Sequence, residues 1–319
     1  MKVKSLVSLL FITSLLSCSQ QSNIQESRVF CFDTSIHIKI ETSEKSCLKE
    51  VENIFKLYDK LSDNYLSRDI NNVYTINNNL YTDITIDKEL YDLLQISFSI
   101  SEEGAKYFNP LCGSLSKKWK ESLKNNQVLS ESVISEELLK MNSSQVLFKD
   151  NNVIQKIGDA EIDLGGIAKG YALDKAYEYL KEKEIKNYLI NAGNSSILLG
   201  EKNTDDGYFT VGLNDIENAY LKLKNCVIST SSKSVQGVKI GDITYSHIIN
   251  PVDGSAINEN DAVIVISDKG YLGDALSTSM MMNTVEEIKE IEQAQNIKTI
   301  VIKNNEIIYK NEGIEVLYH

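Results

Sequence analysis

The order of helical and strand patterns along the chain is the feature that most limits its fold. Helical spacing of apolar residues dominates the first half, and short apolar runs typical of strands dominate after residue 145. Helical stretches interrupt the strands in the second half, but strands and helices do not alternate regularly there. This order predicts an α+β protein with mixed or antiparallel sheets, and it disfavours a doubly wound parallel sheet.

The boundaries of these elements follow from the apolar periodicity. The predicted helices cover 45–66, 87–100, 114–123, 132–141, 167–183, 272–282 and 285–294. The predicted strands cover 29–40, 145–148, 153–155, 188–191, 196–199, 209–213, 221–223, 227–229, 244–249, 262–267, 299–302 and 307–309.

The N-terminus has the layout of an export signal. Lys2 and Lys4 precede an uncharged run over 5–16, which is shorter than the 20 or so apolar residues that a membrane-spanning helix needs. The run ends in Leu-Leu-Ser-Cys, which resembles a lipobox with Cys18 as the acylated residue, for example with palmitate. An ordinary cleaved signal followed by a chance cysteine is the alternative.

This pattern predicts three parts in the chain. Residues 1–17 form a signal peptide, residues 18–27 form a flexible tether after the lipidated Cys18, and residues 28–319 form one folded domain. We therefore expect the protein to be lipid-anchored on the extracytoplasmic face of a bacterial membrane. The absence of Asp after the cysteine favours the outer membrane in a cell with two membranes.

The formal net charge of −12 argues against nucleic acid as a partner and against protein contact with anionic lipid headgroups. Membrane contact would then run through the lipid on Cys18. The other four cysteines show no CxxC spacing, which disfavours zinc. One disulfide and a set of buried free thiols both remain open.

Two adjacent glycines lead directly into a predicted helix in the segment 163–172, Asp-Leu-Gly-Gly-Ile-Ala-Lys-Gly-Tyr-Ala. Gly165 and Gly166 allow close backbone approach to a ligand, and a helix N-terminus attracts anions. Lys169 lies in the first turn, where the helix dipole disfavours a cation unless an anion such as phosphate is near. The alternative is an ordinary strand-to-helix turn.

The segment 274–278, Asp-Ala-Leu-Ser-Thr, places three oxygen-bearing residues on one helical face. Asp274, Ser277 and Thr278 occupy positions i, i+3 and i+4. Hard oxygen ligands suit Mg²⁺. The alternative is an N-capping aspartate followed by solvated hydroxyls.

Two Asn-Pro pairs mark further loops. His247 precedes the second, Asn250-Pro251, and is a phosphate ligand, an acid–base group or a plain strand residue. The first pair follows Tyr107-Phe108 and suits stacking on a flat ring. Small polar loops at 191–195 and 229–232 leave room for a ligand.

Taken in order, these segments resemble the ApbE family, the FAD:protein FMN transferases. The segments that carry the resemblance are FNPL at 108–111, DLGGIAKGYALD at 163–174, NAGNSS at 191–196, STSS at 229–232, HIINPVDG at 247–254 and DALST at 274–278. The resemblance covers roughly residues 28–310.

The resemblance implies an ApbE-like fold with the active site in a cleft between two subregions. It also implies a Mg²⁺-dependent transferase that cleaves FAD, releases AMP and esterifies FMN to a Thr or Ser of an exported flavoprotein. Asp274 and Thr278 would hold the metal, the Gly166 carbonyl would complete its ligands, and Ser277 is a further candidate.

The remaining carried-over residues would surround the dinucleotide. Asp163 and Lys169 would lie at the nucleotide, and His247 would face the phosphates. The other expected contacts are Tyr107, Phe108 and Asn109 at the flavin or adenine, and Ile248 and Ile249 along the site. A base for the attacking hydroxyl would be Asp274 or His247.

The chain departs from the family pattern at several positions. Asn109 and Leu111 replace an Asp and a Thr, Ser232 replaces a Gly, and NAGNSS lacks a second Gly. The first two bear on the flavin-side contacts, and the others bear on the room for a target peptide. None touches the expected metal ligands.

Three other functions compete with the transferase. The first is a Mg²⁺-dependent FAD pyrophosphatase, in which water attacks and FMN and AMP are released. The second is a non-catalytic flavin-binding lipoprotein, which an intact DALST segment disfavours. The third is a solute-binding lipoprotein, which the helix-then-strand order disfavours.

Overall fold

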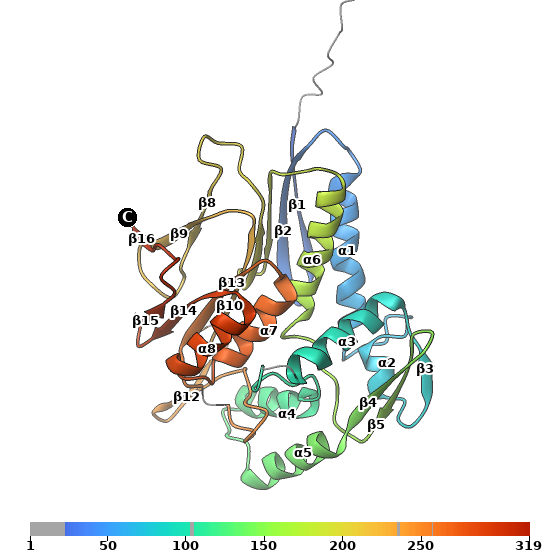
Figure 1. Ribbon diagram of the computed structural model, residues 1–319. Helices are drawn as coiled ribbons and strands as arrows, with labels where there is room; N and C mark the ends of the chain where they lie inside the picture. The colour runs from blue at the N-terminus through green and yellow to red at the C-terminus, as the bar shows by residue number, and fades with distance from the viewer. Residues whose placement is uncertain (1–22, 103–104, 235–236, 257) are drawn as a thin grey trace, which may run out of the picture.

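The computed structural model describes residues 23–102, 105–234, 237–256 and 258–319, so Cys18 and the expected signal peptide lie outside the described residues. Its centre is an eight-stranded sheet in which every neighbouring pair is antiparallel (Figure 1). In spatial order the strands are β1 (Asn23–Cys31), β2 (Thr34–Thr42), β6 (Tyr188–Ala192), β7 (Ser196–Leu199), β10 (Cys226–Ser232), β13 (Ala262–Ser267), β14 (Lys298–Lys303) and β15 (Glu306–Lys310).

The central sheet is covered on both faces. The helices α1 (Cys47–Ser62), α6 (Ala168–Glu182), α7 (Gly270–Met280) and α8 (Val285–Gln295) contribute to the larger core. A small sheet of β8 (Phe209–Gly212), β9 (Ala219–Leu223) and β16 (Leu317–Tyr318) contributes to a second core on the other face. The strand β13 contributes to both cores, because successive side chains of a strand point to opposite faces: Val263 and Val265 belong to the larger core, and Ile264 and Ile266 belong to the second. A strand buried on both faces reads as a continuous apolar run.

A second subregion lies beside the central sheet (Figure 1). It contains α2 (Val73–Asn77), α3 (Lys88–Glu102), α4 (Gly113–Lys124), α5 (Glu131–Ser143) and a sheet of β3 (Asp83–Thr85), β5 (Val153–Ile157) and β4 (Gln145–Lys149). Trp119 of α4 joins it to the loop that carries His247. The Trp119 indole stacks on Tyr245 at 5.8 Å between ring centroids and donates to the Gly254 carbonyl at 2.8 Å.

The first predicted strand, 29–40, is in fact a hairpin. β1 and β2 are joined at Phe32 and Asp33, whose φ angles are 55° and 56°. A two-residue turn of this kind needs positive φ at both positions, which is usually signalled by Gly or Asn. Phe-Asp lacks that signal, so the alternating pattern alone suggests one long strand.

The expected tether is shorter than the sequence indicates. Residues 23–27 belong to β1, where they pair with β2 from Asn23↔Thr42 to Ser27↔Ile38. β1 is the edge strand of the sheet and is largely exposed, so backbone hydrogen bonding holds it without an apolar pattern.

The strand predicted over 244–249 is only partly present in the structure. The short hairpin of β11 (Val238–Ile240) and β12 (Ile243–Tyr245) ends earlier than predicted, and residues 246–249 form a loop. Ser246 explains the change, because its hydroxyl accepts the Ile248 N–H at 3.0 Å and turns the backbone.

None of the helices in the described ranges is long and apolar enough to cross a membrane. The four cysteines of the described part, Cys31, Cys47, Cys112 and Cys226, are all free thiols. Burial raises the pKa of each of them, to about 11 for Cys47. These thiols therefore stay protonated at neutral pH.

Candidate active site

The site is built where the start of α6 meets α7. A Cβ placed on Gly170 would lie 2.1 Å from the carbonyl oxygen of Gly270, so the two helix backbones touch there and no larger residue fits. Asp174, one turn further along α6, accepts the backbone N–H groups of Gly270 at 2.6 Å and Tyr271 at 2.9 Å. These contacts fix the first turn of α7 against α6.

The Asp274 carboxylate is buried at this crossing. Ser196 of β7 and Ser229 of β10 each donate a hydroxyl to its Oδ1 at 2.7 Å, and Gly170 donates its N–H to Oδ2 at 2.7 Å. Burial raises the pKa of Asp274, while the positive charge of Lys169 and the three hydrogen bonds oppose that shift. A buried carboxylate with a raised pKa is a site at which a cation is stabilising.

The Ser277 and Thr278 hydroxyls of α7 do not bond to the Asp274 carboxylate but to its backbone carbonyl. Ser277 and Thr278 both donate to the backbone carbonyl of Asp274, at 3.1 and 3.0 Å. Both also lie within hydrogen-bond distance of Ser231 Oγ, at 3.1 and 3.3 Å. The three oxygens expected to converge therefore do not bond to one another, and Ser277 is almost fully enclosed.

Gly166 lies next to Thr278. A Cβ on Gly166 would be 3.5 Å from Thr278 Oγ1 and 3.2 Å from the Phe108 ring. Gly170 lies in the first turn of α6, where N–H groups have no partner within the helix, and its N–H donates to Asp274 and not to the Gly166 carbonyl four residues earlier. No other N–H in the described part of the chain donates to that carbonyl, which leaves it available to a ligand.

These oxygens fit a magnesium ion better than a softer metal. Among the described residues no cluster of three or more His, Cys, Asp or Glu could hold a metal. A site here would use the Asp274 carboxylate, the Thr278 hydroxyl and the Gly166 carbonyl, with water and phosphate oxygens completing the shell. Mg²⁺ is usually bound in this way, with few protein ligands.

The segment before α6 is held by the first Asn-Pro pair. Asp163 Oδ1 accepts the Gly165 N–H at 2.8 Å, and the Asp163 N–H donates to the Pro110 carbonyl at 2.8 Å. Asn109 Oδ1 accepts the Leu111 N–H at 2.9 Å. The side chains of Asp163 and Asn109, which are both expected near the dinucleotide, therefore also stabilise the backbone turns at 163–165 and 109–111.

The aromatic pair of this segment takes two different positions. Phe108 is only 6% exposed and packs against Gly166, so its ring is part of the wall and offers little open face. Tyr107 is half-buried, and its N–H donates to Ser279 Oγ of α7 at 3.1 Å. The Lys106 ammonium lies 4.7 Å from the Tyr107 ring centroid.

His247 lies on the open side of the site. Desolvation, and then the positive charges of Lys169 and Lys120, lower the pKa of His247 to about 4. The residue keeps an accessible surface, so a ligand can reach the imidazole whose pKa the two lysines lower. Ile248 and Ile249, expected to line the site, are buried in the larger core beneath it.

Sequence reasoning singled out Asp274 but not its partners. Ser196 and Ser229 fall in the small polar loops NAGNSS and STSS, so a signal for them was present without a role. Asp174 closes the 163–174 segment, and its contact with α7 spans 96 positions in sequence. Lys120 belongs to a helix without any recognised motif and gives no sequence signal.

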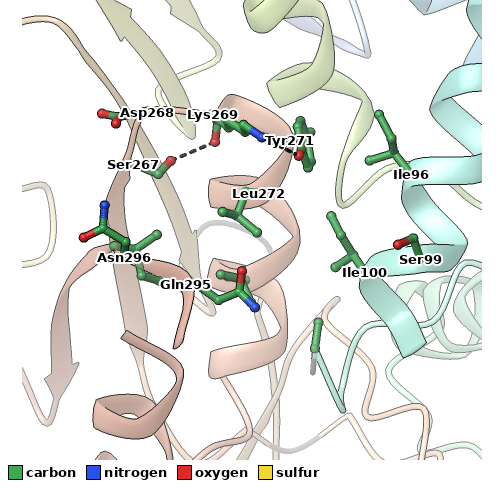
Figure 2. A pocket seen from close by; sticks show the side chains of 13 residues that line it. Ile96, Ser99, Ile100, Ser267, Asp268, Lys269, Tyr271, Leu272, Gln295 and Asn296 are labelled. Atoms are coloured by element: carbon green, nitrogen blue, oxygen red, sulfur yellow. Dashed lines mark hydrogen bonds between the residues drawn. The ribbon is translucent and has the colours of Figure 1, made fainter. Parts of the chain in front are cut away.

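The hollow shown in Figure 2 lies elsewhere on α7. Its volume is about 360 Å³, and it lies between α3, α7 and the end of α8, with Ile96, Ile100, Leu272 and Leu276 among its lining residues. None of the expected site residues lines it. The expected position of the active site in a cleft between two subregions stays a prediction.

Known proteins resemble this chain along most of its length. The model of the ApbE family matches residues 32–301. A protein of Klebsiella pneumoniae (strain 342) is 28% identical over 236 residues, which span 70% of this chain and 72% of the relative. A protein of Treponema pallidum (strain Nichols) is 25% identical, spanning 61% of this chain and 60% of the relative. Both relatives carry the name FAD:protein FMN transferase.

Solved structures share the fold. The ApbE protein of Thermotoga maritima has a TM-score of 0.80 at 22% identity and covers 91% of this chain and 97% of its own. The flavin transferase ApbE of Vibrio cholerae has a TM-score of 0.73 at 17% identity and covers 93% of this chain and 97% of its own.

These likenesses confirm the expected α+β fold of ApbE type. The name shared by the relatives confirms the expected enzyme class, a transferase. Because the family model spans residues 32–301 of 319, the chain belongs to the ApbE family.

Proposed function

We propose that this protein is a FAD:protein FMN transferase that moves FMN from FAD to a Thr or Ser hydroxyl of an exported target protein and releases AMP, with Mg²⁺. The observation that carries the proposal is the group of oxygen atoms at the α6–α7 crossing that could bind a metal: the Asp274 carboxylate, the Thr278 hydroxyl and the Gly166 carbonyl, to which no N–H of the described residues donates. The name shared by the relatives supports the same activity.

The residues of this chain would act mainly by positioning and by charge. Phosphoryl transfer asks the protein to orient the reactants and to neutralise negative charge on the transferred group. Mg²⁺ bound here would supply charge to the pyrophosphate oxygens. Lys169, in the first turn of α6, adds a second positive charge close to Asp274 and His247.

His247 suits the role of base better than Asp274. Asp274 is 6% exposed and both of its oxygens accept hydrogen bonds, so a hydroxyl of another protein cannot easily reach it. His247 is accessible and neutral at pH 7, because its pKa is lowered. A phosphate bound between His247 and the two lysines would raise that pKa again and make the imidazole a stronger base.

The location proposed for this activity is the extracytoplasmic, periplasmic-side face of a bacterial membrane, either inner or outer. The lipobox-like end of the signal peptide and Cys18 support a lipid anchor. An anchored enzyme would meet target proteins after their export, and FAD would have to reach the same compartment. The acidic charge of the chain leaves the lipid as the membrane contact.

The test combines the full chain with FAD, Mg²⁺ and an exported flavoprotein fragment, next to a fragment whose acceptor hydroxyl is removed. The expected result is flavin fluorescence on the intact fragment after denaturing electrophoresis, with equimolar AMP. AMP and FMN without labelling would replace the proposal by the FAD pyrophosphatase. Retained FAD with no product would replace it by a flavin-binding protein.

A further inference from the structure

The two edge strands of the central sheet differ in how well they are protected against pairing with another strand. β15 has five residues, carries Lys310, and pairs with β14 through a register shift between Val301 and Ile302. Short length, irregular pairing and lysine are features by which natural sheets block their edges. β1 has nine residues, contains neither lysine nor proline, and pairs with β2 in unbroken register. β1 is therefore an open edge.

The open edge of β1 carries backbone groups that β2 does not use. On β2, the Ser35 carbonyl accepts the N–H of Gly193, which follows β6, at 3.2 Å, so Ser35 bonds away from β1. Its register partner in β1 is Phe30. Because hydrogen-bonded and non-hydrogen-bonded pairs alternate along an antiparallel ladder, the N–H and C=O groups of residues 24, 26, 28 and 30 all point to the free edge.

The solvent face of β1 carries a short row of exposed side chains, Ile24, Glu26, Arg28 and Phe30. Phe30 is 74% exposed, the largest value for a bulky apolar side chain in the described ranges. Arg28 is one of two arginines in the chain. The other, Arg68, forms an ion pair at 2.6 Å, whereas no carboxylate oxygen of the described residues lies within 4.0 Å of Arg28.

This row is complementary to itself when the strand direction is reversed. A second β1 strand, placed antiparallel about a two-fold axis at Ser27, would set Glu26 opposite Arg28 and Ile24 opposite Phe30, each pair occurring twice. Opposite charges and paired apolar side chains stabilise neighbouring antiparallel strands. The same four residues direct their backbone groups to the edge, so the pairs that match in chemistry are also the pairs that would exchange hydrogen bonds.

Charge and backbone direction together select this register. A two-fold axis at position 26 would place Glu26 opposite Glu26, and an axis at position 28 would place Arg28 opposite Arg28, and like charges directly opposite are destabilising. An axis between two residues would set groups that point to the edge against groups already bonded to β2, so no ladder could form. Ser27 is therefore the centre that satisfies both requirements.

We propose that two copies of this chain pair through their β1 edges, antiparallel about Ser27, and join their central sheets into one continuous sheet. The pairing uses the whole open edge, and β15 is blocked, so the assembly closes as a dimer. The two β1 strands would begin roughly 30 Å apart. A two-fold axis along the membrane normal would place both chain starts at the same height, which suits a lipid anchor on each copy.

Charge reversal tests the dimer. Sedimentation equilibrium of the full chain in density-matched detergent is expected to show monomer and dimer with no larger species. Arg28→Glu places a carboxylate opposite Glu26 twice and is expected to raise the dissociation constant of the dimer by about tenfold or more. The double variant Glu26→Arg, Arg28→Glu exchanges the two charges and is expected to restore the dimer.

The double variant also separates pairing from folding of the hairpin. Glu26 lies 2.6 Å from His37 of β2 within one chain, and the double variant loses this contact. Recovery of the dimer would therefore not come from a more stable hairpin. Lys310→Glu reverses a charge on the other edge strand, β15, and is the control that should leave the dissociation constant unchanged.

Disulfide crosslinking tests the register. The two copies of position 27 would form a non-hydrogen-bonded pair, whose Cα–Cα separation of about 4.5 Å suits a disulfide. Ser27→Cys, oxidised in membranes as the full chain, is expected to give a dimer band that a reductant removes. Gln25→Cys lies on the same face of β1, but its two copies would be about 14 Å apart, so it should stay monomeric.

Three results would overturn the dimer. These are a parent that stays monomeric, an Arg28→Glu variant that dimerises as the parent does, and equal crosslinking of Ser27→Cys and Gln25→Cys. If the chain is monomeric and Phe30→Ser weakens its binding to anionic phospholipid vesicles, the exposed face belongs to the membrane. AMP release from FAD per chain is expected to be the same in Arg28→Glu and the parent, because β1 contributes no residue to the α6–α7 crossing, so loss of the dimer and loss of the transferase are measured separately.

Discussion

The two sides of the site differ in how completely their polar groups are partnered. The closed side, which comprises Asp274, Ser196, Ser229 and the Gly170 N–H, is buried and held by hydrogen bonds of 2.7 Å. On the open side, which comprises Lys169, Lys120 and His247, no carboxylate oxygen of the described residues lies within 4.0 Å of either lysine, and both positive charges lower the pKa of His247. The hydrogen bonds of the closed side stabilise the folded chain, whereas the positive charges of the open side favour the binding of a negatively charged ligand.

The difference has a physical basis. A buried carboxylate is tolerated only with several hydrogen-bond donors, which the strands β7 and β10 and the helix α6 supply. Lys120 is exposed and Lys169 is half-buried, so both ammonium groups can stay hydrated without a carboxylate partner until an anion binds. Changes on the closed side should therefore affect folding and metal binding together, and changes on the open side should affect nucleotide binding and turnover but not folding.

The largest effect is expected from Asp274→Ala. Loss of the buried carboxylate proposed to bind the metal should lower Mg²⁺-dependent AMP release by more than about 1,000-fold, because charge stabilisation is the main contribution to phosphoryl transfer. Release of AMP from FAD with and without Mg²⁺ measures it. Asp268→Asn, an exposed aspartate just before α7, is the control and should retain full activity. Unchanged turnover in Asp274→Ala would contradict the proposal that Asp274 binds the Mg²⁺ ion.

A smaller loss is expected from Lys169→Gln on the open side. Turnover should fall by about 100-fold, mainly through the loss of positive charge at the transferred group. The pKa of His247 should rise at the same time, because Lys169 lowers it in the parent. Kinetics and histidine NMR measure the two effects. Lys181→Gln, at the other end of α6, should change neither. An unaltered His247 pKa would show that the open side is not coupled as described.

Ser229→Ala tests the closed side by pH. The raised pKa of Asp274 means that protons compete with a cation there, so Mg²⁺ binding should weaken as the pH falls through that pKa. The Ser229 hydroxyl lowers this pKa, and its loss should move the weakening to higher pH. Titration of Mg²⁺ with FAD present, over the range from about pH 5 to about pH 8, measures the shift.

The control for this variant is Thr230→Val. Thr230 is the next residue on β10 and projects to the opposite face of the strand. Its profile should match that of the parent. The pH argument is refuted if Ser229→Ala and Thr230→Val have the same profile.

The smallest effect is expected from Asp174→Asn, and it concerns stability. Burial raises the pKa of Asp174 from 3.8 to about 6. Between these values the folded state holds a proton that the unfolded state has lost, so the free energy of unfolding decreases as the pH rises through this window. Urea unfolding at several pH values should show this slope in the parent and a smaller slope in Asp174→Asn. Equal slopes would assign the pH dependence to other groups.

Most of the elements were predictable because their patterns are local. The apolar spacing of α1, α3, α6, α7 and α8 fixed each helix to within a few residues, and the all-apolar run of β13 marked a strand buried on both faces. The hairpin of β1 and β2 was missed because Phe32 and Asp33 carry no turn signal. The pairing of residues 23–27 was missed because an exposed edge strand needs no apolar side chains.

The sequence by itself determined the family resemblance, the expected export signal and the candidate residues Gly166, Asp274 and Thr278, because each rests on a short run of neighbouring residues. Only the tertiary structure decided which groups bond to Asp274 and which cations surround His247. The Gly170–Asp274 hydrogen bond joins residues 104 positions apart, and the positive charge of Lys120, on a helix of the other subregion, lowers the pKa of His247. Contacts of that kind depend on how the helices and sheets pack, and no local spacing in a single chain encodes them.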